Sequence, residues 1–431
     1  MRTLSATLAA AQLTDRTPYF DLKFYRGASL IGDYSCSGAP TDNTAKLKYL
    51  KMNEFQYSSG GNGSETTILL NDTDRSIPDL RGCSVDIGIG DVTTEGNETA
   101  EYPRMWVKHQ RLHSYPGNAT VELTLEGWAE ALDEEHARAD NFITDPALYY
   151  LWERDTTVYA IMAAILHADV SYVPFVLDAL GVDDGIINTF QPYFELNSER
   201  NRYESKLDIL TRLLYMTKCY MRPLADNHLE LVYPQTTDST DLTIYSDTIP
   251  WFYEFNELKN ELIPNSIIVF CDNSEMDNNY SWPNLKLGQS TDADAVTRYN
   301  STNVYGLYQA PTITVQGDAD NRADAILARI KAETVSQALV IPHHCGIQLY
   351  DYLLVKDKRG RLAYEDCKVR VTGLTHTFSR DNGLFRLSIY GGGLVNFPMY
   401  SDEQLLNMKT DEQLQSVERH TPRLKGRGAK L

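Results

Sequence analysis

Apolar and polar residues alternate with a period of two over much of the first third of the chain. The segment Thr120–Glu126 alternates without interruption, which is typical of a strand that buries one face. Stretches rich in glycine, serine and asparagine, such as Ser58–Ser64 and Thr93–Asn97, separate these segments and favour turns. The pattern therefore predicts a strand-rich domain over about residues 18–132. Its candidate strands include Tyr19–Tyr25, Thr66–Leu70 and Cys83–Ile89.

A helical period replaces the alternation in the middle of the chain. Asp155–Thr157 offers an N-cap, and the apolar residues of Val158–Leu166 then fall on one helical face. A second helix is predicted over Tyr203–Lys218. These helices and the hairpin that follows them indicate a small mixed domain. The hairpin consists of Cys219–Leu224, the turn Ala225–Asn227 and Leu229–Tyr233.

Strand patterns return in the last third, with one helix among them. Short buried strands are predicted at Ser266–Phe270 and Thr312–Val315, and the polar stretch Asp272–Asn303 between them is predicted to be a long loop. Asn321–Val335 has the apolar spacing of a helix. The strands expected after it are Ala338–Ile341, Tyr352–Lys356, Cys367–Leu374 and a hairpin of Thr375–Ser379 with Leu384–Ile389, turned at Asp381–Gly383.

Composition and charge narrow the class of protein. The 431 residues carry a formal net charge of -19, which disfavours a protein that binds nucleic acid through clustered Lys and Arg. An acidic surface can instead line a channel through which a polyanion slides. Tyr outnumbers Phe by 27 to 13, which favours sheets and packed subunit interfaces. No apolar run reaches the roughly 20 residues that cross a bilayer, so no membrane insertion is expected.

The ends and the cysteines add three expectations. Met1–Gln12 has one basic residue and a weak apolar segment, so we interpret it as an amphipathic helix and not as a signal peptide. The six cysteines are widely spaced, which is typical of free thiols in a reducing cytosol. The C-terminal arm carries five cationic residues that could dock on a partner, touch DNA or be disordered. They are Arg419, Arg423, Lys425, Arg427 and Lys430.

The residues that could bind a metal or act in catalysis do not form a recognised motif. His343–Cys345 and His376 offer metal ligands without zinc-like spacing, so a structural loop is favoured. Asp133–His136 is not a His-Glu-x-x-His motif. No Gly-x-Ser-x-Gly elbow occurs, and Asp351 and Asp357 suit a turn and a strand end. We expect no catalytic residue, no metal and no cofactor. Paired carboxylates leave a glycan hydrolase open as an alternative.

Five stretches resemble the hub proteins of contractile and siphophage tails and of the related type VI secretion spike. They are the Ala-rich helix Ala323–Ala332, the pattern Gly346–Val355, the strands Arg370–His376 and Leu384–Tyr390, and the opening Ser5–Gln12 followed by Pro18. The resemblance implies a mainly β fold with an α+β insertion: two tail-tube-like β-barrels plus a small helical and hairpin domain. It also implies that Gly346–Asp351 turns the chain into a barrel strand.

The resemblance further implies domains and partners. The expected domains are 1–147, a first β-barrel with an N-terminal helix; 148–240, a small α+β domain; 241–396, a second β-barrel with one packed helix; and 397–431, a helix and a basic flexible arm. The implied protein is a non-enzymatic homotrimeric hub of the virion tail tip, assembled in the host cytoplasm. Its partners would be a distal tail or tail-tube protein, a tip, spike or fibre protein, and a tape-measure protein. DNA would pass the lumen during genome ejection without specific binding. A carbohydrate-binding tail adhesin and a tail-associated glycan hydrolase remain alternatives.

Overall fold

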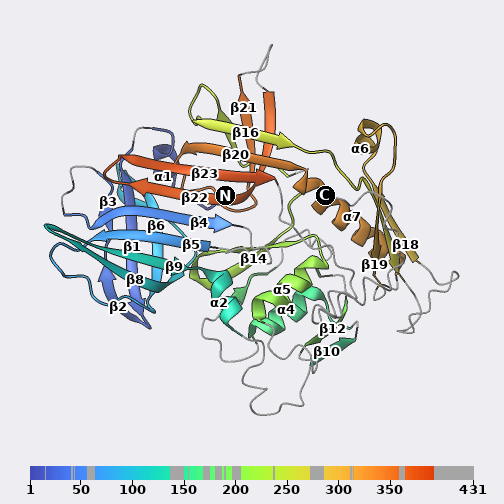
Figure 1. Cartoon of the computed structure of the whole chain (residues 1–431), viewed down its shortest axis with the longest axis horizontal. Helices are drawn as coiled ribbons and strands as arrows, with labels where there is room; N and C mark the ends of the chain where they lie inside the picture. The colour runs from blue at the N-terminus through green and yellow to red at the C-terminus, as the bar shows by residue number, and fades with distance from the viewer. Residues whose placement is uncertain are drawn as a thin grey trace.

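The structure is a computed structural model, and it describes most of the chain. Figure 1 shows strands in two groups, with helices between and beside them. The described residues are 1–14, 16–39, 42, 44–55, 64–135, 150–153, 155–167, 175–179, 187–188, 191–196, 205–235, 238–271, 286–310, 313, 315–358 and 365–392.

The first group of strands confirms the strand-rich pattern predicted at the start of the chain. Helix α1 begins after Ser5, whose hydroxyl accepts a hydrogen bond from the backbone of Leu8 and so caps the helix. The strands then alternate buried and partly exposed residues, because each buries one face in a common core. The elements are α1 (Ala6–Ala11), β1 (Pro18–Arg26), β2 (Ser29–Asp33), β3 (Cys36–Ser37), β4 (Leu47–Phe55), β5 (Ser64–Asn71), β6 (Ser84–Thr93), β7 (Gly96–Glu101), β8 (Met105–Tyr115), β9 (Asn118–Glu126) and α2 (Trp128–Glu134).

The middle of the chain holds the predicted helices and hairpin. Val158, Ile161, Met162 and Ile165 are all buried on one face of α4, as the helical period predicts. The hairpin of β13 and β14 forms with the predicted turn. The elements are β10 (Tyr150–Glu153), α4 (Val158–His167), β11 (Val176–Leu177), β12 (Tyr193–Leu196), α5 (Lys206–Tyr215), β13 (Tyr220–Pro223), η1 (Ala225–Asn227) and β14 (His228–Val232).

The last third forms a second sheet region and a small three-stranded sheet. Helix α7 packs on the three-stranded sheet, whose strand order is β18-β17-β19. The predicted hairpin after Thr375 is confirmed, and Gly383 takes the positive φ of 58° that its turn requires. The elements are β15 (Leu242–Tyr245), β16 (Glu254–Lys259), β17 (Ser266–Cys271), β18 (Lys286–Thr291), α6 (Ala293–Arg298), β19 (Tyr305–Gln309), α7 (Gln316–Glu333), β20 (Val335–Pro342), β21 (Tyr352–Asp357), β22 (Glu365–Ser379) and β23 (Leu384–Gly392).

The two strand groups share one sheet. Strand β22 pairs with β4 from Gly373 to Ser379, so the order β16-β20-β23-β22-β4-β5-β9-β8 is continuous across both groups. The prediction of a mainly β fold is confirmed. The prediction of closed barrels is corrected, because pairing among the described strands follows an open path that ends at β16 and β2. The physical reason is that β4 pairs with β5 along one edge and with β22 along the other, so neither edge of β4 is left to close a barrel within the first strand group.

Two element predictions in the last third are also corrected. The second half of the predicted loop Asp272–Asn303 contains strand β18 and helix α6, which begins after the N-cap Asp292. The predicted strand Thr312–Val315 does not form at Ile313 or Val315, which lie in no strand. The strand in this region is β19, which precedes the predicted position and pairs in parallel with β17.

Three hydrophobic cores support these elements. One core lies within the first strand group, a second lies under the β20–β23 region, and the third joins the helices α2, α4, α5 and α7. The third core therefore ties the middle of the chain to the three-stranded sheet. Among the described helices, none is both long and apolar enough to span a membrane.

Candidate functional site

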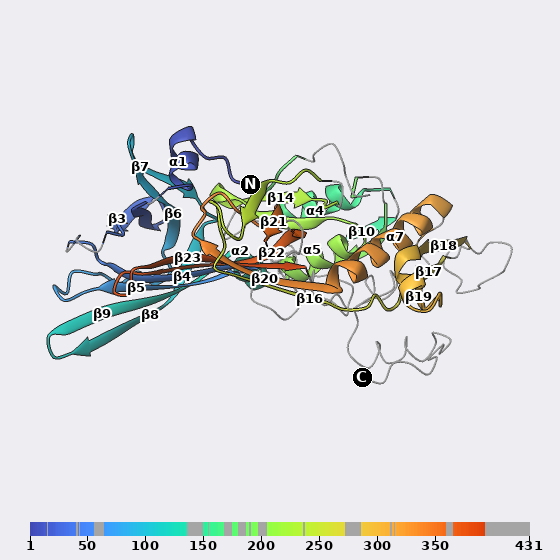
Figure 2. The same ribbon diagram turned by 90° about the horizontal axis from the view of Figure 1, so that it is seen from above.

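The continuous sheet from β16 to β8 has one covered face and one polar face. On the covered face Leu339, Ile389 and Leu374 are buried side by side on β20, β23 and β22. On the other face the pairing registers line up Thr377, Lys51, Thr67, Thr124 and His109 in one row across five strands. Figure 2 shows this layer nearly edge-on, with α1 and β7 on one side of it. The exposed face is therefore rich in hydroxyl groups.

The two ends of this sheet are strand edges. Strand β16 pairs with β20 on one side, and no described strand pairs with its other side. Strand β8 pairs with β6 only at Met105 and Trp106, so beyond Val107 its one described strand partner is β9. Within the described residues, the loop between β5 and β6 contacts this part of β8 through side chains. The Gln110 side chain forms hydrogen bonds with the backbones of Leu80 and Pro78, and the Arg75 side chain donates to Ser114. We call these strand edges the β16 edge (254–259) and the β8 edge (108–115).

The two edges differ in charge and both expose apolar side chains. The β8 edge contains Lys108 and Arg111 and no carboxylate, whereas the β16 edge contains two glutamates and one lysine. Leu112 on the β8 edge is 52% exposed, and Leu258 on the β16 edge is 59% exposed. Unpaired backbone groups beside exposed apolar side chains are the features of a strand that pairs with another chain.

A buried polar junction lies behind the sheet and fixes the first residues of the chain. Arg2 donates to the Glu54 carboxylate at 2.7 Å and to the carbonyl of Ile347 at 2.6 Å, and its guanidinium lies 4.0 Å from the Tyr102 ring centre. Glu54 also contacts Nε2 of His376 at 2.8 Å. The junction therefore connects the N-terminus, β4 and β22 through contacts that exclude water.

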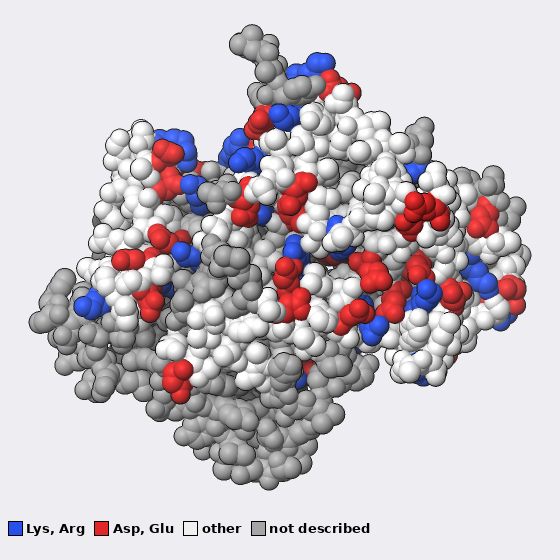
Figure 3. All heavy atoms as spheres, turned by 180° about the vertical axis from the view of Figure 1, so that it is seen from behind, with Lys and Arg blue, Asp and Glu red and all other residues white. Residues whose placement is uncertain are grey.

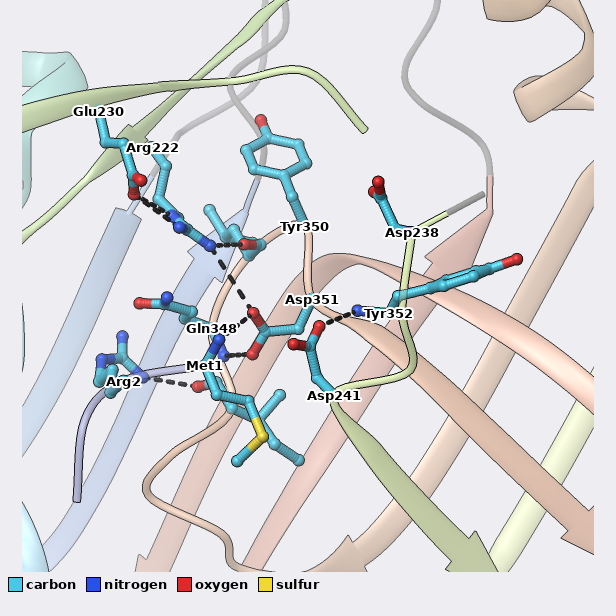
Figure 4. Close-up of polar contacts among 12 residues, drawn as sticks. Met1, Arg2, Arg222, Glu230, Asp238, Asp241, Gln348, Tyr350, Asp351 and Tyr352 are labelled. Carbon is cyan, nitrogen blue, oxygen red and sulfur yellow. Dashed lines mark hydrogen bonds and ion pairs between the residues drawn. The ribbon is translucent and has the colours of Figure 1, made fainter. Parts of the chain in front are cut away.

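A second part of the junction centres on Asp351, as Figure 4 shows. One carboxylate oxygen of Asp351 lies 2.7 Å from the Met1 nitrogen, and the other accepts from the backbone of Gln348 at 2.8 Å. Arg222, which forms an ion pair with Glu230 on the β13–β14 hairpin, approaches Asp351 to 3.7 Å. The turn before β21 is thereby tied to the middle of the chain.

Arg370 provides a third connection, in addition to those at Glu54 and at Asp351. It donates to Asp238 at 2.8 Å and to the carbonyls of Gln235 and Tyr350, and its guanidinium stacks over Tyr352 with the ring centre 4.2 Å away. Since a guanidinium offers several donors in a fixed plane, one side chain can hold three segments in register.

Burial and pairing shift the pKa values of these groups. Burial would raise the pKa of Glu54, but Arg2 and His376 outweigh it and lower that pKa. Burial would lower the pKa of Arg2, but Glu54, Tyr102 and Asp351 outweigh it and raise that pKa. For Asp351 burial dominates over the Met1 amine and raises the pKa. Glu54 and Arg2 are therefore held as a buried ion pair.

The structure brings together two of the four metal-ligand candidates predicted from the sequence. His343 and His376 face each other with their ring nitrogens 2.9 Å apart, and both are buried. His344 and Cys345 are buried in the same turn, where burial raises the pKa of the Cys345 thiol to about 12. In the part of the chain that is described, no group of three or more His, Cys, Asp or Glu side chains could hold a metal ion.

The remaining predicted positions take structural places. Asp351 ends the turn before β21 and Asp357 ends β21, as the sequence indicates, and both are buried. Trp128 lies in the core, whereas Trp251 is 37% exposed and packs edge-on against Tyr253. The C-terminal arm (Arg419, Arg423, Lys425, Arg427 and Lys430) and its suggested partner docking lie outside the described residues.

Charge is mixed on the side of the molecule opposite to the view of Figure 1. Figure 3 shows acidic and basic side chains interspersed there. Among the described residues, ion pairs near the surface include Lys23 with Asp21 and Arg104 with Asp86. The described part of the face in Figure 3 shows no extended basic patch of the kind that phosphate binding requires.

Comparison with solved structures identifies similar folds. No protein-family model and no curated protein sequence matches the chain. A tail protein from Neisseria meningitidis MC58 matches with a TM-score of 0.57 and 12% identity, over 86% of this chain and 96% of that one. The 43 kDa tail protein of prophage MuSo2 from Shewanella oneidensis matches with a TM-score of 0.55 and 9% identity, over 87% and 98%. The predicted likeness to phage tail proteins is confirmed, and the chain has the fold of these two proteins over most of its length.

Proposed function

We propose that the chain is the structural, non-enzymatic hub at the distal end of a phage tail tube. In this proposal three copies form a ring that joins the sixfold tube to the threefold tip, at the tail tip of the virion. The observation that carries the proposal is the fold shared with nearly the whole length of two tail proteins. Its partners are a tail-tube or distal tail protein above, a tip or fibre protein below, and a tape-measure protein within.

The sheet supports the ring. An eight-stranded layer with a positive edge at one end and a net negative edge at the other can pair head to tail with identical copies. Such a heterologous contact closes into a ring when the rotation per copy divides the circle, and closure covers the β8 edge and the β16 edge of every copy. Three copies, each with a first unit in residues 1–147 and a second in 241–396, place six strand-rich units around one axis. This number matches a sixfold tube.

The polar face supports a channel for DNA. Its central row contains three threonines with Lys51 and His109, and a neighbouring row contains Thr375, hydrogen-bonded to Asn53 at 2.9 Å, with Glu65 and Glu126. Neutral hydroxyl and amide groups attract phosphates less than a basic surface does. In the ring this face lines the lumen, and DNA slides along it during ejection without specific binding.

A charge-swap experiment tests the head-to-tail contact. Arg111 on the β8 edge and Glu254 on the β16 edge lie on the same polar face of the sheet. In sedimentation velocity, Arg111→Glu alone and Glu254→Arg alone are expected to shift the wild-type trimer toward monomer. The double variant Arg111→Glu with Glu254→Arg restores opposite charges on facing edges and is expected to restore the trimer.

The control is Lys23→Glu, a charge reversal at a side chain that is 37% exposed and lies on β1, which pairs with β2 and β6 and with neither edge strand. It should leave the trimer intact. Trimers that tolerate both single reversals would rule out these edges as the contact. A wild-type chain that stays monomeric at every concentration would rule out the ring itself.

A further inference from the structure

Two buried histidines face each other at the polar junction behind the sheet. His376 lies on β22 and His343 follows β20, and each is 1% exposed. Nε2 of His343 lies 2.9 Å from Nδ1 of His376, whose Nε2 lies 2.8 Å from the Glu54 carboxylate. The His343 ring stacks on Phe385 at 4.2 Å, and its Nδ1 is buried without a hydrogen-bond partner. The pair therefore has no contact with water.

The contacts allow one arrangement of protons. The ionised Glu54 carboxylate only accepts, so Nε2 of His376 carries a proton and donates to it. Nδ1 of the neutral His376 then accepts from the N–H at Nε2 of His343. Nδ1 of His343 is left as a bare acceptor, which matches its lack of a partner. A further proton on the pair would place a buried N–H at that nitrogen with nothing to accept it, which is costly.

The surroundings also oppose a further proton. Arg2 from the N-terminus, Arg16 from the segment before β1, and His344 from the same turn lie close enough to disfavour positive charge on His343. Glu54 is the one carboxylate that favours charge on His376, and Arg2 already pairs with it. Tyr102, whose ring meets His376 edge-on at 5.0 Å, is kept neutral by burial, which raises its pKa well above the usual value.

The N-terminal strap, residues 1–12, closes this pocket. At one end Arg2 binds Glu54 and the backbones of residues 346 and 347. At the other end Gln12 donates to Asp91 and accepts from the backbone of Cys345. The strap therefore spans the turn between β20 and β21 that contains His343, and its removal would open the junction to water.

We propose that the His343–His376 pair is an acid-sensitive switch that releases the N-terminal strap from the junction. Near neutral pH both imidazoles are neutral and the strap stays bound. In acid the two rings gain protons only when the strap leaves, so protons shift the equilibrium toward the open form. The open form exposes Glu54 and the covered side of the junction, while the strands themselves stay paired.

The direction and size of the effect follow from linkage. Burial lowers the pKa of both histidines in the closed form, His343 the more strongly. The open form has the ordinary value of about 6.5, so it binds more protons below that pH and strap binding weakens as pH falls. Between pH 7.5 and 5.5 a histidine that stays neutral in the closed form raises the opening constant about tenfold, which is the factor expected for His343. His376, whose pKa is lowered less strongly, adds a smaller factor, so the pair raises the opening constant more than about tenfold.

Hydrogen exchange tests this proposal. Protection factors of residues 2–12, corrected for intrinsic rates, should fall more than about tenfold from pH 7.5 to 5.5 in the wild-type chain. Glutamine keeps an N–H near the Nε2 position, so His343→Gln should reduce that fall about tenfold. The double variant His343→Gln with His376→Gln should remove the remaining fall. Strand β17 serves as an internal reference whose protection should not change.

His113→Gln is the matched control, because His113 pairs with Glu122 on the β8–β9 hairpin and is partly exposed. It should behave as the wild-type chain does. The proposal is overturned if strap protection changes less than about threefold with pH, or if His343→Gln responds as strongly as the wild-type chain. Should the double variant not fold, the single variant still decides between these results.

Discussion

The buried ion pair of Arg2 and Glu54 offers a direct test of how the junction holds the chain together. We consider replacing Arg2 with Met, which keeps the aliphatic bulk and removes the guanidinium. The side chains of Arg2 and Glu54 are 10% and 3% exposed, and their atoms lie 2.7 Å apart. The variant therefore leaves a buried carboxylate without its cation, and it also removes the donor to the Ile347 carbonyl.

The expected loss is large because the partner stays buried. Removing one member of a buried pair costs about 3–5 kcal/mol, whereas replacing both by neutral groups costs much less. Arg2→Met and Glu54→Gln should each lower the free energy of unfolding by about that amount. The double variant should lose no more than one single variant, which gives a coupling energy of at least about 3 kcal/mol.

Urea unfolding at pH 7.5, followed by circular dichroism, measures these free energies. The matched control is Arg81→Met, which removes a cation from an exposed pair with Asp79 and should cause no measurable loss. Additive losses for Arg2→Met and Glu54→Gln would refute the reasoning, because they would mean that the two side chains do not act as a pair. So would a loss no larger than that of the control.

Three further substitutions test packing at α7 and a buried ion pair at α5. A Cβ at Gly288 would lie 1.9 Å from the carbonyl oxygen of Ala319, so Gly288→Ala should push α7 off β18 and lower the thermal midpoint by several degrees, about 1–3 kcal/mol. Gly317→Ala in the first turn of α7 meets nothing within 4 Å and should raise stability by up to about 1 kcal/mol. Equal effects of the two changes would contradict this account. Lys206→Met removes the buried ammonium group that lies 3.0 Å from the Glu135 carboxylate. It should lower the urea midpoint by an amount equivalent to about 3 kcal/mol. An unchanged midpoint would show that this ion pair does not hold α5.

The elements that the sequence predicts correctly are those with a local signal. Thr120–Glu126 alternates without a break and forms β9, and the apolar face of Val158–Leu166 forms α4. The turn at Asp381–Gly383 forms because glycine accepts the positive φ there at little cost. By contrast the one buried residue of β18 is Gly288, which has no side chain, so the sequence of β18 resembles a loop. Its partners β17 and α7 make it a strand.

The candidate site depends on contacts that no local pattern encodes. Arg2 and Glu54 are 52 residues apart, and Glu54 and His376 are 322 apart. The sequence draws attention to His343 and His376 as possible ligands, and the structure brings them together as a hydrogen-bonded pair. Barrel closure fails as a prediction for a similar reason. Alternation specifies which face of β4 is buried, but it does not specify that β22 takes its free edge.

Electron microscopy of the purified chain in negative stain tests the central claim most directly. The account predicts particles with threefold symmetry and a central hole, three copies to each ring, with the polar face of the continuous sheet lining the opening. Compact single-copy particles without a hole, at concentrations where tail proteins assemble, would contradict it.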